Sequence, residues 1–504
     1  DHRINGLVRG DLVRPNEIGG VGEAYTFTHL LTAETAYQAL PKRSRAALHE
    51  QTARWLQSKV PDDDVVAFHL EQAANYRSEL GEGDAALTAE AVRLLLAVAD
   101  RSTAFGDASA AVSHAERACR LTPVPATLSV QARIAHSRAS RVAGDTTAAI
   151  EWARQAEEHA KSIDNRALLW RARIQSNYLE AVSDPHYQVS RTLKMCEQAI
   201  GELGDLHDEA GLADAFRLRA SAYSLLGQIN ATSRDALSAI EHAHRAPSEV
   251  RRYSDLLTAV LLPTEAGNAS IGEGRALLER VKVQVGDDPA MSQDIQDARL
   301  WFDALAGDPA RGRECLREKY ELLLDQGSIS WAASWLASGI ARCERWDDDL
   351  EAATQSLRTA ALRMEQNGET GYASSIFAEL ALLLAKLGRT DEAAAALVRS
   401  RELAPEIDRY NALFWAGAEG LLAAIHGDGE ASKEAFRGAL QVAAETEFTF
   451  AEAEIRLAQS QAREQLGDLM GAREAAQQAL RLVEHKGFEG PITVARARVV
   501  ELGG

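Results

Sequence analysis

Small and apolar residues recur along most of the chain at spacings that predict packed helical hairpins. In several stretches, alanines stand 5, 9 and 12 residues after a glycine. Three examples are Ala111, Ala115 and Ala118 after Gly106, Ala149, Ala153 and Ala156 after Gly144, and Ala472, Ala476 and Ala479 after Gly467. Offsets of four and three residues put these methyl groups on one helical face, where a neighbouring helix can approach closely. Each stretch therefore predicts the second helix of a hairpin.

A glycine followed by aspartate marks the turn before each of these stretches. The pairs are Gly106-Asp107, Gly144-Asp145, Gly307-Asp308, Gly427-Asp428 and Gly467-Asp468, with Gly227, Gly267 and Gly388 as variants. With the turn at 346 included, positions 267, 307, 346, 388, 427 and 467 lie 39 to 42 residues apart. A weaker unit fills the interval from 144 to 227, because Ala132-Arg133-Ile134 recurs there as Ala172-Arg173-Ile174. A period near 40 residues predicts a continuous all-α stack of about ten hairpins.

These turns and alanine offsets resemble the tetratricopeptide repeat. Two first helices also carry the aromatic and small residues of that family, namely Trp335 with Gly339 and Ala220 with Tyr223. The resemblance covers about residues 87–485, although the period exceeds the family's usual 34 residues. It implies a right-handed α-solenoid whose first helices line a concave groove. HEAT-type repeats, which share a period near 40, are the alternative.

The first sixty residues follow a different pattern. Residues 7–15 end a helix and enter a strand, residues 19–22 form a glycine-rich turn, and residues 24–29 return with strand-like alternation. A helical pair over residues 32–39 and 42–59 is expected next, with Pro41 placed to start its second member. A β-hairpin that follows a helix is typical of the wing of a winged helix.

This segment resembles the end of the winged-helix domain in signal-transduction ATPases with numerous domains, the STAND class. The residues that carry the resemblance are Tyr25, Phe27, His29, Ala36, Tyr37, Leu40, Pro41, Lys42, Arg45, Leu48, His49 and the run 69–73. The resemblance implies a bacterial regulator in which His29 faces the phosphates of a nucleotide held by the ATPase. Alternatively, the His29 ring caps the wing or packs under the following helix.

Three segments are therefore expected: residues 1–60 as the C-terminal part of a winged helix with one β-hairpin, 61–86 as a helical linker, and 87–504 as the superhelix with a C-terminal capping helix. The charge balance supports this division. The chain carries 55 basic and 74 acidic residues, a net charge of −19. The first 61 residues, by contrast, carry eight basic and six acidic residues. An acidic chain disfavours nucleic acid and anionic membranes as partners, since both need a positive face.

Motifs for catalysis and metal binding are missing from the sequence. No Gly-Lys dipeptide occurs, so the chain has no P-loop, and no Gly-x-Ser-x-Gly elbow or His-Glu-x-x-His motif occurs either. The four cysteines are isolated from one another and from histidines at zinc-ligand spacing. No apolar run reaches the roughly 18 residues of a membrane helix. We therefore expect a cytoplasmic protein without catalytic residues, metal or cofactor, with ATP or ADP bound only by an ATPase upstream.

Tetratricopeptide register turns seven side chains of the first helices toward the groove: Arg93, Arg138, Arg141, Arg171, Tyr178, Arg217 and Trp301. Arginines from adjacent units favour an acidic peptide, a phosphate or a carboxylate, because guanidinium groups bind such anions through paired hydrogen bonds. The alternative is that these arginines form ion pairs between neighbouring repeats.

The sequence thus predicts a sensor superhelix of a STAND-type regulator. It would bind a protein, a peptide or a small anionic ligand, and it would contact its own upstream ATPase or output domain. A constitutive protein–protein interaction scaffold is the alternative. The identity of the ligand, the output domain and any self-association stay open at this stage.

Overall fold

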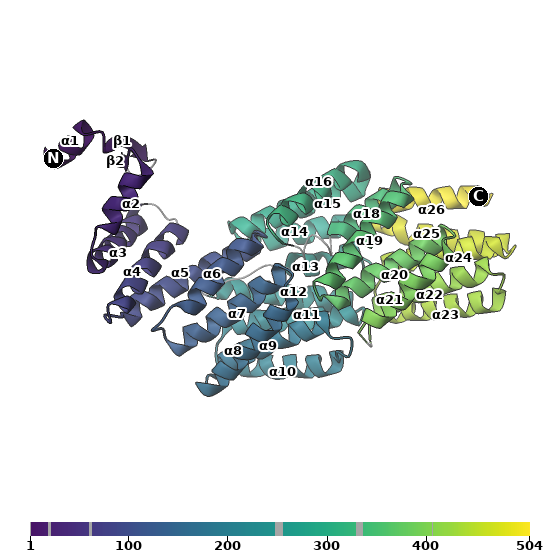
Figure 1. The fold of residues 1–504 in the computed structure, drawn as a ribbon. Coiled ribbons are helices and arrows are strands. Elements are labelled where there is room, and N and C mark those ends of the chain that lie inside the picture. Colours follow the sequence, from purple (N-terminus) through teal and green to yellow (C-terminus); the bar gives the residue numbers. More distant parts are fainter. Residues whose placement is uncertain are drawn as a thin grey trace. The chain divides into compact units, whose positions relative to one another are not determined.

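A computed structural model describes residues 2–18, 22–59, 63–246, 256–328, 336–405 and 407–503. The chain divides into two compact units. The first comprises Asp1–Arg101 and Ala110–His136, and the second comprises Ser102–Ser109 and Ser137–Gly504. Each unit is described on its own below (Figure 1).

The first unit begins with the predicted helix and hairpin. Helix α1 spans His2–Arg9, and strands β1 (Val13–Ile18) and β2 (Gly22–Phe27) pair in antiparallel fashion. The predicted helical pair follows as α2 (Leu30–Gln38) and α3 (Lys42–Lys59). The order helix, hairpin and helical pair is therefore confirmed, with boundaries within a few residues of those expected.

Two further helices, α4 (Asp63–Glu79) and α5 (Ala85–Ala104), complete the core of this unit, which includes Leu70, Leu87 and Leu95. A chain of polar rings joins α2 to α3 and α4. The Tyr37 hydroxyl lies 2.8 Å from His49 Nε2 and 2.9 Å from the Tyr76 hydroxyl. Helix α2, in contrast, buries none of its residues.

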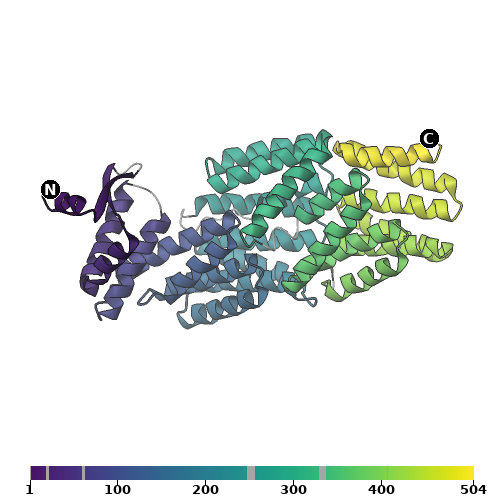
Figure 2. The same ribbon diagram turned by 45° about the horizontal axis from the view of Figure 1, so that its top comes forward.

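The repeats continue as helical hairpins to the end of the chain (Figure 2). The first members of the hairpins after α5 are α7 (Ala126–Val142), α9 (Arg166–Ser183), α11 (Glu209–Leu225), α13 (Leu256–Glu265), α15 (Pro289–Gly307), α18 (Ala337–Trp346), α20 (Thr370–Lys386), α22 (Arg409–Ile425) and α24 (Thr449–Gln465). The second members are α6 (Ala108–Arg120), α8 (Thr146–Ser162), α10 (Val189–Asp205), α12 (Ile229–Arg245), α14 (Ile271–Val285), α16 (Pro309–Asp325), α19 (Leu350–Gln366), α21 (Thr390–Leu403), α23 (Gly429–Glu445) and α25 (Leu469–Lys486). Helix α26 (Glu489–Glu501) follows the last hairpin. The prediction of an all-α solenoid is confirmed.

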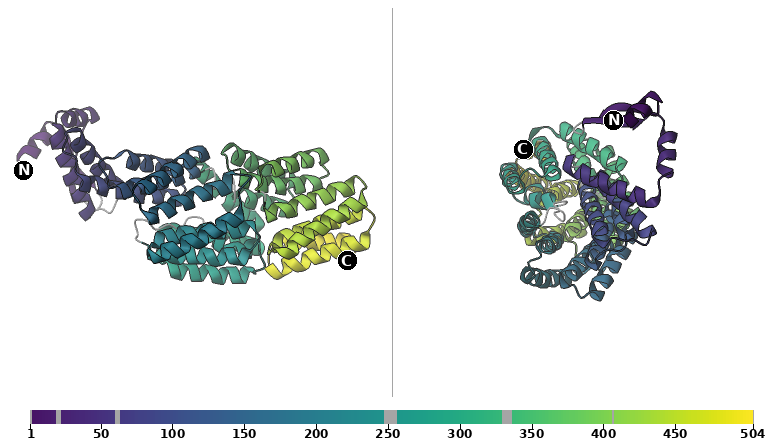
Figure 3. Two further views of the ribbon diagram at one scale, coloured as in Figure 1. Left: turned by 90° about the horizontal axis from the view of Figure 1, so that it is seen from below. Right: turned by 90° about the vertical axis from the view of Figure 1, so that its left-hand side faces the viewer.

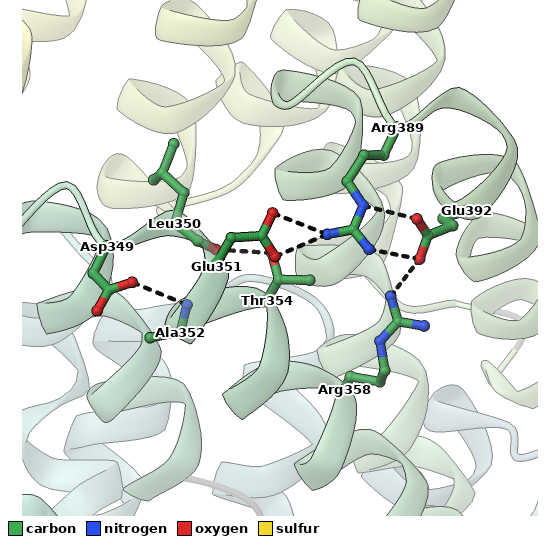
Figure 4. Close-up of polar contacts among 8 residues, drawn as sticks. All are labelled: Asp349, Leu350, Glu351, Ala352, Thr354, Arg358, Arg389 and Glu392. Carbon is green, nitrogen blue, oxygen red and sulfur yellow. Dashed lines mark hydrogen bonds and ion pairs between the residues drawn. The ribbon is translucent and has the colours of Figure 1, made fainter.

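The turn between the two helices of a hairpin depends on the residue pair found in the sequence. Gly427 adopts φ +77°, a left-handed conformation that glycine reaches without steric cost and that ends the first helix. Asp428 then caps the second helix, because its side chain accepts a hydrogen bond from the Ala431 N–H. Where the glycine is replaced, as at Asp348, φ is still positive at +62°. Its neighbour Asp349 caps α19 in the same way (Figure 4).

The alanines after these turns are buried as predicted. Those named above on α8 and α25, Ala149, Ala153, Ala156, Ala472, Ala476 and Ala479, are all 0% exposed. Ion pairs at partly exposed sites also connect consecutive repeats. Arg389, for example, contacts Glu351 on α19 and Glu392 on α21, and Arg358 on α19 also contacts Glu392 (Figure 4). Exposed pairs of this kind contribute at most about 1 kcal/mol each, so the buried alanine faces hold the hairpins together.

Turns that are far apart in sequence also contact each other within the second unit. Thr146 Oγ1 donates a hydrogen bond to the Asn367 carbonyl 221 residues away, at 2.6 Å. The N–H of Asn230 donates to Glu447, 217 residues away, and the Lys486 ammonium donates to the Gly267 carbonyl, 219 residues away. Helices α9 and α20 pack together, as do α15 and α26. The blue and teal helices of one superhelical turn therefore lie beside the green and yellow helices of the next (Figure 3, left).

Candidate ligand-binding cavity

A cavity of about 480 Å³ lies inside the second unit, with first helices of several repeats around it. Its size falls within the range of small-molecule and peptide-side-chain pockets. Helix α20 forms one continuous wall, on which Glu369, Tyr372, Ser375, Ile376 and Glu379 line the cavity. Glu369 is the N-cap of this helix, and Tyr372, the adjacent pair Ser375 and Ile376, and Glu379 follow at spacings of three or four residues, so they lie on one side of the helix.

Guanidinium groups stacked on an aromatic ring occupy the end of this wall near Glu369. The guanidinium carbons of Arg141 and Arg217 both lie 5.2 Å from the centre of the Tyr178 ring. Arg141 also approaches Glu369 at 3.4 Å, and both side chains are almost fully buried. Cation–π contacts in desolvated surroundings stabilise such a stack and hold the guanidinium groups in fixed positions. This end of the cavity presents two cations and one anion from these contacts.

Carboxylates gather at the other end of the same wall. The Tyr410 hydroxyl donates to Glu379 at 2.7 Å, and Arg342 lies 4.0 Å from the same carboxylate. Neighbouring Glu265 also lines the cavity, and its charge helps to raise the pKa of Arg342. Burial raises the pKa of Tyr410 well above its usual value, and the neighbouring Glu379 adds to this effect, so the phenol stays protonated and donates.

Asp408 faces the cavity beside this group. It caps α22 by accepting a hydrogen bond from the Asn411 N–H at 3.1 Å. Burial disfavours the carboxylate form and raises the pKa of Asp408 to about 6. This aspartate can therefore exchange a proton near neutral pH.

Apolar side chains also line the cavity. Ile376 lies between Glu369 and Glu379 along α20, and Val182, Leu225, Leu257 and Leu261 add to the apolar surface. A further ionic group lines the cavity where Lys319 on α16 contacts Asp294 and Asp297 on α15 of the same hairpin. The arrangement suits binding of an amphipathic molecule. A buried apolar surface supplies affinity, and the charged groups fix the orientation of the ligand.

The structure divides the residues predicted from the sequence into three groups. Arg141, Tyr178 and Arg217 line the cavity together. Arg138 and Arg171 both approach Asp214, at 2.8 Å and 3.7 Å, which is the arrangement that the ion-pairing alternative describes. The remaining three, Trp301, Arg93 and His29, are not among the residues that line the cavity.

Trp301 packs in an apolar cluster with Phe302 and Leu305, and it is 5% exposed. Arg93 belongs to the first unit and is exposed on α5. His29 is also exposed, at the N-cap position of α2, and its side chain makes no capping hydrogen bond. Their roles in binding stay predictions.

Sequence reasoning missed the carboxylate end of the cavity. The arginines stood out in an acidic chain, whereas single acidic residues did not. One signal was available, because Glu379 interrupts the otherwise apolar run from 376 to 385. A lone carboxylate in such a run must be paired when it is buried, since an uncompensated buried charge is costly.

Among the residues that the structure describes, no group of three or more histidines, cysteines or acidic residues could hold a metal ion. Burial raises the pKa of the Cys196 and Cys343 thiols to about 12, which keeps both sulfurs protonated. Within the described ranges, no helix combines the length and apolarity needed to span a membrane.

No protein-family model matches the chain, and no curated protein matches it. Solved structures do resemble it. The hetero-tetramer Cut9-Hcn1 of APC/C is 13% identical, with 93% of this chain and 95% of that chain covered and a TM-score of 0.49. Yeast Tom70 is 13% identical over 92% and 97% of the two chains, with a TM-score of 0.33. A Rap protein complexed with competence and sporulation factor is 12% identical over 82% and 98%, with a TM-score of 0.34. At these values the likenesses carry no functional argument.

Proposed function

We propose that this chain is a non-catalytic binding superhelix that senses a ligand in the cavity of its second unit. The observation that carries the proposal is the cavity itself, where stacked guanidinium groups, carboxylates and apolar side chains all face one space. Buried polar groups beside an open volume are what a specific binding site requires.

We further propose that the superhelix belongs to a STAND-type regulator. The support is the resemblance of residues 25–73, together with the exposed apolar surface of the first unit. Leu30 is 81% exposed, Leu31 is 76% exposed, and Phe27 on β2 is 42% exposed. A two-stranded hairpin is marginal alone, and a run of exposed apolar side chains calls for a covering surface. The rest of a winged-helix domain would supply that surface.

In such a regulator, ligand binding would shift an upstream ATPase between ADP-bound and ATP-bound states. The shift requires that the superhelix bind those two states with different affinity. His29 would face the nucleotide phosphates, as the resemblance implies. Its exposed position at the start of α2 leaves the ring accessible.

Peptide display on the full chain tests the binding proposal. Random peptides would be selected on the wild-type protein and then measured against Ser221→Trp, which places an indole in the cavity. The matched control is Ser162→Trp, at an exposed position at the end of α8. Selected peptides should lose at least about tenfold in affinity for the first variant and keep their affinity for the second. Equal affinity for both variants would refute binding in the cavity.

The STAND proposal has its own test. It predicts a P-loop ATPase encoded before Asp1, and that portion would be expressed separately. Calorimetry would then compare its binding to this chain in ADP and in ATP. Tighter binding in ADP supports a superhelix that holds the switch off. Equal binding in both nucleotides would favour the constitutive scaffold.

A further inference from the structure

Helix α20 runs from one charged end of the cavity to the other, so its residue spacing gives the distance between them. Glu369 stands beside the Arg141 and Tyr178 stack, and Glu379 stands beside Arg342 and Tyr410. The ten residues between the two glutamates correspond to roughly 15 Å along a helix, at about 1.5 Å per residue. An extended peptide advances about 3.3 Å per residue, so roughly four to five residues span that distance.

The two ends differ in the sign of their charge. At the first end, two guanidinium groups on the Tyr178 ring accompany the single carboxylate of Glu369. At the second end, the carboxylates of Glu265 and Glu379 line the cavity together with the guanidinium of Arg342. A ligand with one negative and one positive end would therefore bind in one orientation only.

The middle of the cavity selects for apolar groups. Ile376 lies between the charged ends on α20, and Val182, Leu225 and Leu261 add to the apolar lining. The hydroxyl of Ser221 also lines the cavity and can hydrogen-bond a peptide backbone, whereas the Ser375 hydroxyl donates to Asp408. An acidic peptide or an inorganic anion, as the arginines alone suggested, would meet apolar surface and then carboxylates along this path.

We propose that the ligand is a short extended peptide of about four to five residues, with its free carboxylate on Arg141 and Arg217, an apolar centre, and a cationic group between Glu265 and Glu379. This inference rests on the proposed function and gives it a substrate class. The carboxylate would accept hydrogen bonds from the guanidinium groups, and the ammonium would donate to the glutamates.

Affinity-selection mass spectrometry on the full chain tests the inference. The probe is a pool of pentapeptides that begin with lysine, continue with three apolar residues and end in leucine with a free carboxylate. Two matched pools change one end each. In the first the C-terminus is amidated, and in the second the amino terminus is acetylated and lysine is replaced by norleucine. The starting pool should be retained, and each altered pool should be retained at least about tenfold less, the effect of losing one charge-assisted contact.

Protein variants then connect each end of the peptide to its side chains. Arg217→Gln should weaken retention of the free-carboxylate pool and leave retention of the amidated pool unchanged. Glu379→Gln should weaken retention of the lysine pool and leave retention of the norleucine pool unchanged. The controls are Arg154→Gln and Glu434→Gln, which remove exposed charges on α8 and α23. Both controls should retain all pools as the wild type does.

Two results would overturn the inference. One is a complete lack of retention of the starting pool, and the other is retention that ignores amidation and Arg217→Gln. Neither result would refute binding in the cavity, because the displayed peptides and the Ser221→Trp variant test that separately. Failure of both experiments would remove the proposed function itself.

Discussion

Two sets of arginines on helices α7, α9 and α11 lie in different surroundings. Arg138 on α7 and Arg171 on α9 both point to Asp214 on α11. One helical turn away, Arg141 on α7 and Arg217 on α11 lie over the Tyr178 ring of α9 and line the cavity. The two layers differ in their central residue, an aspartate in one and a tyrosine in the other. The aspartate layer joins neighbouring repeats through ion pairs, and the tyrosine layer faces the cavity.

The difference predicts opposite results for stability and binding. The first layer is a mutually compensated set of buried charges. Removing one member of such a set leaves the others uncompensated and lowers stability strongly. In the second layer Arg217 is half-buried and lines an open volume, so its charge can be removed with less effect on folding. Under the proposed function, that removal weakens binding.

Asp214→Asn should destabilise the protein most. The substitution leaves Arg138 and Arg171 buried without their carboxylate, which costs about 3–5 kcal/mol when a buried pair is broken. Urea unfolding followed by circular dichroism would measure the loss. Asp205→Asn, at an exposed site on α10, is the control and should change little. If both variants lose the same free energy of unfolding, the ion pairs to Asp214 do not stabilise the first layer.

Asp408→Asn should have the opposite effect and raise the free energy of unfolding. The pKa of Asp408 is raised to about 6, so the folded state binds its proton more tightly than the unfolded state does. This group therefore lowers stability as pH rises from about 4 to 6, and the penalty persists above that range. Asparagine caps helices equally well, so the variant should be more stable above pH 6, by on the order of 1–3 kcal/mol.

The difference between wild type and Asp408→Asn would be measured by urea unfolding at pH 4, 5, 6 and 7. It should grow through this range and then stay constant. Asp428→Asn replaces an exposed helix cap on α23 and serves as the control. A difference that does not change with pH would contradict the account of Asp408.

Arg171→Gln and Arg217→Gln should separate stability from binding. The first should lower the unfolding free energy by about 1–3 kcal/mol, because it breaks charge-assisted contacts with Asp214. Its affinity for selected peptides should stay within about twofold of wild type. The second should cost less than about 1 kcal/mol in stability, since the Arg217 side chain is only half-buried. Unfolding curves and peptide titrations on both variants would check this, and a loss of binding in Arg171→Gln alone would reverse the assignment.

The contact between superhelical turns should show the smallest effect. Glu447 accepts hydrogen bonds from the N–H and the side-chain amide of Asn230, at 2.7 Å and 2.8 Å, at an exposed site. Glu447→Ala should cost about 0.5–1.5 kcal/mol, the usual net value of hydrogen bonds at such positions. Hydrogen exchange should become faster around residues 227–230 and 446–450. Unchanged exchange there would mean that apolar packing alone joins the turns.

The sequence predicted the features that depend on neighbouring residues. The turn of glycine at 427 and aspartate at 428, and the buried face of Ala149, Ala153 and Ala156, follow from local conformation and helical periodicity. The two arginine layers do not. Arg138 and Arg141 are three residues apart and share a helical face, so periodicity alone could not tell which one meets Asp214.

Features that depend on distant residues were also beyond the sequence pattern. The approach of Glu369 to Arg141 joins positions 228 residues apart. It follows from the length of one superhelical turn, which is set by how every hairpin packs on the next. The carboxylate end of the cavity combines Glu265 and Glu379 from separate repeats. No local motif brings those residues together.

Photo-crosslinking tests most directly whether the cavity is the binding site. Pentapeptides of the starting pool would carry a diazirine on their central residue, and crosslinked positions would be mapped by mass spectrometry. The account predicts crosslinks to cavity residues of α9, α11, α13 and α20, among them Val182, Leu225, Leu261 and Ile376, and their loss in Ser221→Trp. Crosslinks confined to the outer helices or to the first unit would contradict it.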